Sequence, residues 1–96
     1  MNSDQPEPTL TSPDRYAERI DTAMRRLLPT LRQQRGWDIH EMGKVAGVTG
    51  QVIHNLETGR TKLSLQMLAR LAHGLGIPLS DLVGILEQFG NGIQGL

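Results

Sequence analysis

Three histidines have the most versatile side chains in this sequence, but their spacing does not predict a metal site. His40, His54 and His73 form no His-Glu-x-x-His motif and no other paired spacing, and the chain contains no cysteine. Zinc sites in proteins need several histidine, cysteine or carboxylate ligands brought together, commonly in such paired motifs. We therefore expect no bound metal and interpret the imidazoles as surface or packing groups.

Other catalytic patterns are equally missing from the sequence. The spacing of serine, histidine and aspartate suggests no nucleophilic constellation, and without cysteine there is no thiolate nucleophile and no disulfide framework. Gly74-Leu75-Gly76 lacks the third glycine of a dinucleotide-binding loop and follows no predicted strand. A chain of 96 residues leaves little room for a closed pocket beside its core. We expect a protein that is not an enzyme and that uses no cofactor.

Positive and negative side chains balance over the whole chain, with ten Lys and Arg and ten Asp and Glu. Their distribution is uneven, because residues 22–76 are basic whereas residues 1–21 and 77–96 are acidic. A basic middle segment suits a polyanionic partner, since the local potential steers association more than the net charge does. The same pattern also fits an ordinary scatter of solvated charges, and charge alone leaves both interpretations open.

Length and hydrophobic content predict one domain with an aliphatic core. Hydrophobic residues make up 38% of the chain, and Trp37, Tyr16 and Phe89 are its only aromatic residues. Residues 1–11 contain two prolines and mostly polar side chains, so we expect a disordered arm followed by a domain over residues 12–96. No apolar run is long enough to span a membrane, and the first residues lack a signal-peptide pattern. These features favour a cytoplasmic location without a membrane partner.

Apolar residues at three- and four-residue steps predict helices throughout and no strand. The first helix begins with Ser12 as its cap and Pro13 in its first turn, and it ends at Gly36. This first helix has an extended, acidic N-terminal part. Pro29 interrupts its pattern and either kinks it or splits it in two.

Two short helices follow. Asp38 and Glu41 have the spacing of a capping box at the start of the second helix, which ends at Gly47. Thr49 caps the third helix, and Gly59 ends it. About four residues join the two helices, an arrangement that presents the second of a helix pair to the major groove of DNA.

Two further helices complete the predicted all-α fold. Ser64 caps the fourth helix, and the fifth is expected over residues 79–90, with Gly90-Asn91-Gly92 as its end. Its apolar stripe either covers the domain's own core or pairs with a second copy of the chain. The stripe consists of Leu82, Ile85, Leu86 and Phe89.

The chain resembles the phage-repressor-like helix-turn-helix family, the Cro and lambda-repressor type, most specifically from the second helix onward. The resemblance covers about residues 24–83 and all five helices in order. Its most specific elements are Ala46-Gly47-Val48 at the turn, Leu56-Glu57-Thr58-Gly59 at the end of the third helix, and the end of the fourth helix. Gly43 stands where the family usually has alanine, which we expect to reduce helix stability by up to ~1 kcal/mol.

The resemblance implies that the third helix is a recognition helix whose outward residues contact bases. These residues are Gly50, Gln51, His54 and Asn55. Amide side chains suit this role, since each can form two hydrogen bonds with adenine. Gly50 offers no side chain, so we expect loose selectivity at its position.

The resemblance also implies contacts to the phosphate backbone from the loop after the third helix and from the neighbouring caps. The expected residues are Thr49, Thr58, Arg60, Thr61 and Lys62, together with the backbone amide of Ile39, which stands where the family often has a phosphate-binding glutamine.

Arg32 and Glu57 match a pair that forms a partly buried ion pair in the family. We therefore assign them to the scaffold that ties the first helix to the end of the third, and not to DNA contact. Removal of one partner of such a pair strands a charge.

Together, the motifs favour a sequence-specific DNA-binding transcription regulator, namely a dimeric repressor on a palindromic operator in double-stranded DNA. One alternative from the same family is an antitoxin that represses its operon and holds a toxin. Another is a protein-interaction adaptor that keeps the fold without binding DNA, which the zero net charge, Ile39 and Gly50 favour.

Overall fold

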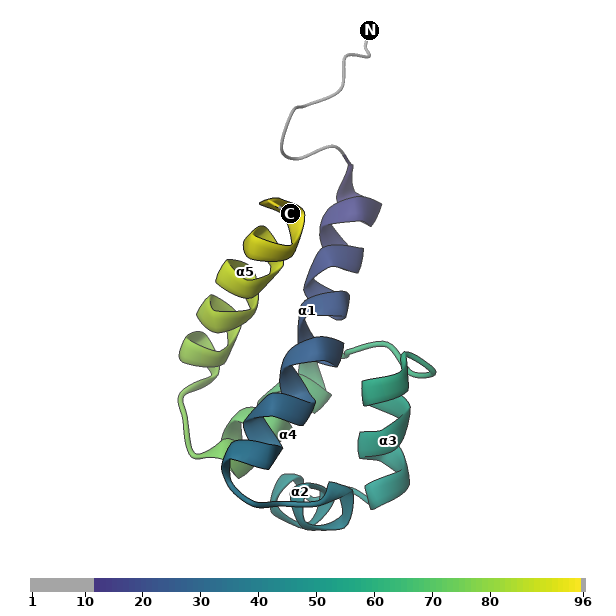
Figure 1. Ribbon diagram of the computed structural model, residues 1–96, viewed down its shortest axis with the longest axis vertical. Coiled ribbons are helices and arrows are strands. Elements are labelled where there is room, and N and C mark those ends of the chain that lie inside the picture. Colours follow the sequence, from purple (N-terminus) through teal and green to yellow (C-terminus); the bar gives the residue numbers. More distant parts are fainter. Residues whose placement is uncertain (1–11, 96) are drawn as a thin grey trace, which may run out of the picture.

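The computed structural model describes residues 12–95, and for residues 91–95 it describes only the helical backbone. The described chain forms five helices and no strand, which confirms the predicted all-α fold. The helices are α1 (Pro13–Gln34), α2 (Ile39–Ala46), α3 (Gly50–Thr58), α4 (Leu65–Leu75) and α5 (Leu79–Gly95) (Figure 1). The predicted arm, residues 1–11, lies outside the described residues.

Helix α1 is one continuous helix, so Pro29 does not split it. Its N-terminus is capped by Ser12, whose Oγ accepts the backbone N–H of Arg15 at 3.1 Å. Pro29 removes one intrahelical hydrogen bond, but Met24 and Leu28 on the preceding turns are almost fully buried. Packing of this apolar face holds the helix together across the missing bond.

The two short helices begin and end where their caps predict. Asp38 accepts the N–H of Glu41 at 2.8 Å, and the Glu41 carboxylate accepts the N–H of Asp38 at 2.9 Å. Gly47 ends α2 in the left-handed conformation with φ 76°. Gly43 has a packing role that sequence analysis missed, because a Cβ there would lie 2.8 Å from the backbone of Val48. The absent side chain therefore lets the turn close on α2, which offsets the expected loss of helix stability.

The helices pack around one aliphatic core. Helix α1 runs beside α5 and also packs against α3, while α2 packs against α3 and α4 (Figure 1). The largest fully buried side chains are Met24, Leu28, Met42, Ile53, Leu71, Leu82 and Leu86. Every helix supplies at least one of them, so the position of α3 depends on the whole core.

Helix α5 differs from its prediction in two ways. It continues through Gly90-Asn91-Gly92 to Gly95. Gly90 is buried against α1, where a Cβ would make an ordinary contact of 3.4 Å with Arg19 Cγ, so this glycine lies inside the helix and does not end it. Leu82 and Leu86 are 0% and 1% exposed and belong to the chain's own core. Of the two alternatives, the chain's own core therefore holds for Leu82 and Leu86, which corrects their place in a predicted dimer interface; of the predicted stripe only Ile85 and Phe89 are exposed, and their pairing with a second copy stays a prediction.

Candidate nucleic-acid interface

The outer face of α3 carries two amide side chains that are joined to each other. Gln51 and His54 are exposed, and Asn55 is half-buried. Gln51 Nε2 donates a hydrogen bond to Asn55 Oδ1 at 3.0 Å. This bond leaves the Gln51 carbonyl oxygen as an acceptor and the Asn55 amide group as a donor. An acceptor beside a donor complements the N6 amine and N7 of adenine in the major groove.

Gly50 does not lie on this outer face, which corrects its predicted role as a base-contacting position. The residue is buried although it begins the helix. The imidazole of His40, on α2, covers it: a Cβ at Gly50 would lie 2.5 Å from His40 Nδ1. His40 itself is exposed, so an imidazole from the neighbouring helix occupies the surface position at the start of α3.

The threonine hydroxyls at the two ends of α3 differ in what they offer to a phosphate. Thr49 Oγ1 accepts the N–H of Val52 at 3.3 Å, so its own proton stays available for donation. Thr58 Oγ1 donates to the carbonyl oxygen of His54 at 2.9 Å, so its proton is used within the helix. Thr49 is therefore the better placed of the two as a donor.

The side chain of Ile39 is half-buried and packs against the core. It offers no polar group to a phosphate, so contact through its backbone amide stays a prediction.

The loop between α3 and α4 exposes the three residues predicted to contact phosphate, Arg60, Thr61 and Lys62. Its backbone is fixed at both ends. The N–H groups of Arg60 and Thr61 donate to the carbonyl oxygen of Asn55 at 2.9 and 3.2 Å. The N–H of Leu63 donates to the Asp21 carboxylate at 2.8 Å. The side chains thus project from a loop whose backbone is anchored at both ends.

Two residues of α1 beside this loop were missed by sequence analysis. Besides binding Leu63, Asp21 lies 4.0 Å from Lys62 Nζ through its second oxygen. Arg25 lies at the C-terminal end of α3, where a Cβ on Gly59 would be 2.8 Å from its Nη1. Both contacts join residues more than thirty positions apart, so no local sequence pattern signals them.

The ion pair between Arg32 and Glu57 fixes α3 relative to α1. Two guanidinium nitrogens of Arg32 donate to the two Glu57 oxygens at 2.8 and 3.0 Å, and the third donates to the Trp37 carbonyl oxygen at 3.2 Å. The side chains are only 17% and 10% exposed. The hydrogen bond to Glu57 raises the pKa of Arg32 despite the opposing effect of burial. One side chain therefore ties together α1, α3 and the entry to α2.

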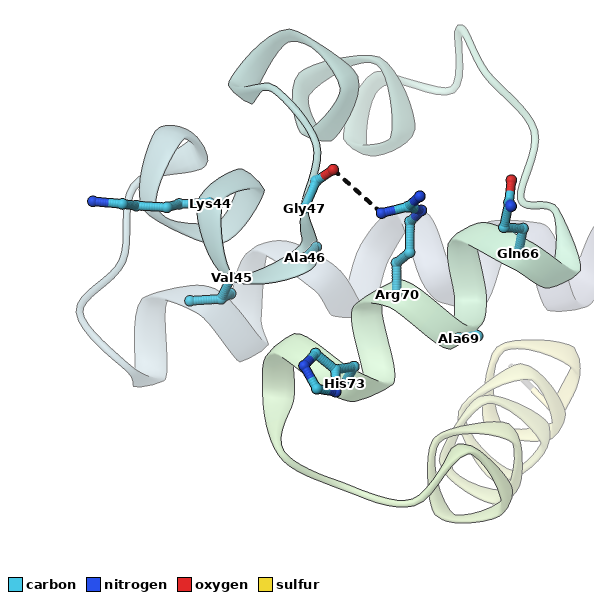
Figure 2. A pocket seen from close by; sticks show the side chains of 8 residues that line it. All are labelled: Lys44, Val45, Ala46, Gly47, Gln66, Ala69, Arg70 and His73. Atoms are coloured by element: carbon cyan, nitrogen blue, oxygen red, sulfur yellow. Dashed lines mark hydrogen bonds between the residues drawn. The ribbon is translucent and has the colours of Figure 1, made fainter.

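A shallow basic groove lies between α2 and α4 (Figure 2). Arg70 Nη1 donates to the Gly47 carbonyl oxygen at 3.3 Å and so braces the turn between α2 and α3. Lys44, Gln66 and His73 line the rest of the groove, which has a volume of about 490 Å³. None of the residues predicted to contact DNA lines this groove.

Within residues 12–95, no three His, Asp or Glu side chains lie close enough together to hold a metal ion. None of the helices in this part of the chain combines the length and the apolar character that a membrane span requires.

This arrangement of short helices, turn and exposed polar helix is that of a helix-turn-helix domain. The model of a family described as helix-turn-helix domain matches residues 23–83, and the chain belongs to this family of DNA-binding domains.

Two relatives have names that describe regulators. The chain is 35% identical over 68 residues to the HTH-type transcriptional regulator DdrOP3 of Deinococcus deserti, a match that covers 71% of this chain and 53% of that protein. It is 30% identical over 56 residues to the HTH-type transcriptional regulator SutR of Escherichia coli, with 58% of this chain and 32% of that protein covered. The chain thus spans about half and a third of their lengths. No solved structure gave a significant match.

Proposed function

We propose that this protein is a transcription regulator that binds a specific DNA sequence through the major groove. The observation that carries the proposal is the hydrogen-bonded pair of Gln51 and Asn55 on the outer face of α3, which presents an acceptor beside a donor. His54 is exposed on the same helix and adds a further polar group. The family membership and the names of the two relatives support the same function.

Affinity for the DNA phosphate backbone comes from side chains in the loop after α3 and at the start of α3. Arg60 and Lys62 supply positive charge, Thr61 a hydroxyl, and Thr49 a hydroxyl whose proton is available. Arg25 adds a third cation beside Gly59. Such contacts release counterions and position the domain without sequence preference. In the proposed mechanism, α3 therefore contacts the bases and the loop contacts the phosphates.

We further propose that the regulator is a repressor that acts as a dimer by occupying its operator. Ile85 and Phe89 on α5 remain 38% and 37% exposed, and the exposed apolar side chains Leu79 and Val83 lie on the same helix. Pairing of Ile85 and Phe89 across a two-fold axis would cover apolar surface. Two recognition helices then contact half-sites one DNA turn, ~34 Å, apart.

The direct test is selection of bound sequences from a random-sequence duplex pool, followed by sequencing and by mass measurement of the complex. Enrichment of a palindrome bound by two chains supports the whole proposal. Enrichment of an asymmetric site bound by one chain supports DNA recognition but contradicts the dimer. Binding without any enrichment, or no binding, contradicts sequence-specific regulation and favours the protein-interaction adaptor.

A further inference from the structure

One carboxylate of α1 meets the loop after α3 through both of its oxygens. Asp21 Oδ1 accepts the backbone N–H of Leu63 at 2.8 Å, and Oδ2 lies 4.0 Å from Lys62 Nζ. The Asp21 side chain is only 20% exposed, whereas that of Lys62 is 80% exposed. The first contact is therefore a short hydrogen bond to a charged acceptor in a partly buried place, and the second is a weak, solvated pairing.

The hydrogen bond to Leu63 controls the direction of the chain next to Lys62. The N–H that Asp21 binds belongs to the peptide that joins these two residues, and a peptide unit is planar, so holding this N–H fixes the whole unit. The Leu63 side chain packs against the core. The other end of the loop is held by two backbone N–H groups that bind the end of α3. The loop is thus held in one arrangement between α3 and α1 (Figure 1).

We propose that Asp21 is a positioning residue for binding to the DNA phosphate backbone, which acts through the loop and does not itself contact DNA. This inference rests on the proposed DNA-binding function. A loop that is already ordered loses less conformational entropy when phosphates bind to its side chains, so the bond to Leu63 strengthens binding.

The negative charge of the same carboxylate acts in the opposite direction. It attracts the Lys62 ammonium group and repels the phosphates that approach this cation. Asp21 therefore strengthens DNA binding as a hydrogen-bond acceptor and weakens it as a charge.

Two substitutions of Asp21 separate these effects. Asp21→Asn and Asp21→Ala both remove the charge, but only asparagine keeps an oxygen that can accept the Leu63 N–H. We expect Asp21→Ala to bind a selected operator duplex and an unrelated duplex about five-fold more weakly than Asp21→Asn, by equal factors. The ratio of the two affinities should match that of the wild type, because the outer face of α3 is unchanged.

Two further measurements distinguish the position of the loop from the stability of the fold. Hydrogen exchange in the free protein should show a protected Leu63 amide in the wild type and in Asp21→Asn, and a rapidly exchanging one in Asp21→Ala. Ser12→Ala is the matched control, because it lowers stability by removing the cap of α1, a hydrogen bond to Arg15 and not to the loop. At a temperature at which every variant is folded, it should bind both duplexes as the wild type does.

Equal affinities of Asp21→Ala and Asp21→Asn, or an unprotected Leu63 amide in the wild type, would overturn this inference; the proposed function would stand if Asn55→Ala had lost preference for the operator. A Ser12→Ala variant that bound as weakly as Asp21→Ala would show an effect of stability and would also overturn it. A loss confined to the operator duplex would show that Asp21 acts on α3 and not on the loop. If the wild type bound neither duplex, the inference and the proposed function would fail together.

Discussion

Two polar contacts of helix α1, one to α3 and one to the loop that follows α3, differ in kind. At one, Arg32 and Glu57 meet in a two-point ion pair at 2.8 and 3.0 Å, with most of both side chains buried. At the other, Asp21 binds the loop backbone at 2.8 Å but lies 4.0 Å from Lys62, whose side chain is 80% exposed. The first contact fixes a helix, whereas the second fixes a backbone and leaves a cation at the surface.

The difference shows which charged side chain stabilises the fold, Arg32, and which is available to bind a ligand, Lys62. All three nitrogens of Arg32 bind Glu57 or Trp37, and the side chain is only 17% exposed, so Arg32 is poorly placed to contact DNA. Lys62 retains most of its exposure and gains little from Asp21, since exposed pairs contribute at most about 1 kcal/mol. The charge of a residue in the sequence therefore says less about DNA contact than its partners do.

The largest expected effect comes from breaking the buried contact. Arg32→Ala leaves Glu57 with an uncompensated charge in a mostly buried position, and we expect the free energy of unfolding to fall by about 3 kcal/mol. Urea denaturation measures it. Arg26→Ala, an exposed arginine on the same helix, is the control and should change stability by less than about 0.5 kcal/mol. Equal effects of the two variants would contradict the scaffold role.

A second prediction concerns the recognition helix that this contact holds. Gln51→Ala and Asn55→Ala should each weaken binding to the selected operator by about 2 kcal/mol, since each removes part of one base contact. Because the two amides are hydrogen-bonded to each other, the double variant should lose clearly less than the sum. Titrations of a labelled operator duplex give the three values. Strict additivity would show that the amides act separately.

The smallest expected effect comes from removing the exposed contact between Asp21 and Lys62. Asp21→Asn keeps an oxygen that accepts the Leu63 N–H but removes the charge near Lys62. Affinity for any duplex should rise about two-fold, within the range of exposed ion pairs, with little change in stability. The control is Asp14→Asn, which removes a negative charge from the surface hollow that Asp14, Asp21 and Lys62 line together. If both variants strengthened binding equally, general charge and not the pairing with Lys62 would be responsible.

Local patterns in the sequence predicted the helices well. The capping box at Asp38 and the cap at Thr49 mark where α2 and α3 begin, and Gly47 and Gly59 mark where they end. Such signals involve residues within one or two turns, so one sequence displays them completely. Pro29 was undecided, because its outcome depends on how well the buried face of α1 packs.

What the sequence did not predict involves residues that meet only in the folded chain. His40 covers Gly50 and Asp21 binds Leu63 across separations that carry no periodicity or spacing rule. Gly90-Asn91-Gly92 predicts a helix end, but α5 continues to Gly95, because a glycine whose surroundings support the helix looks the same in the sequence as one that ends it. The sequence also predicts an outward position for Gly50, because its burial under His40 of α2 involves another helix and leaves no local signal.

In this account, α3 determines the preference for a DNA sequence, and the adjoining loop determines the affinity for the DNA phosphate backbone. The most direct test measures the dissociation constants of Asn55→Ala and Lys62→Ala for the operator duplex and an unrelated duplex over a series of salt concentrations. Asn55→Ala should lower the ratio of the two affinities by about ten-fold or more and leave the salt dependence unchanged. Lys62→Ala should keep that ratio and reduce the salt slope by about one. If both variants changed the same quantity, the division between α3 and the loop would be wrong.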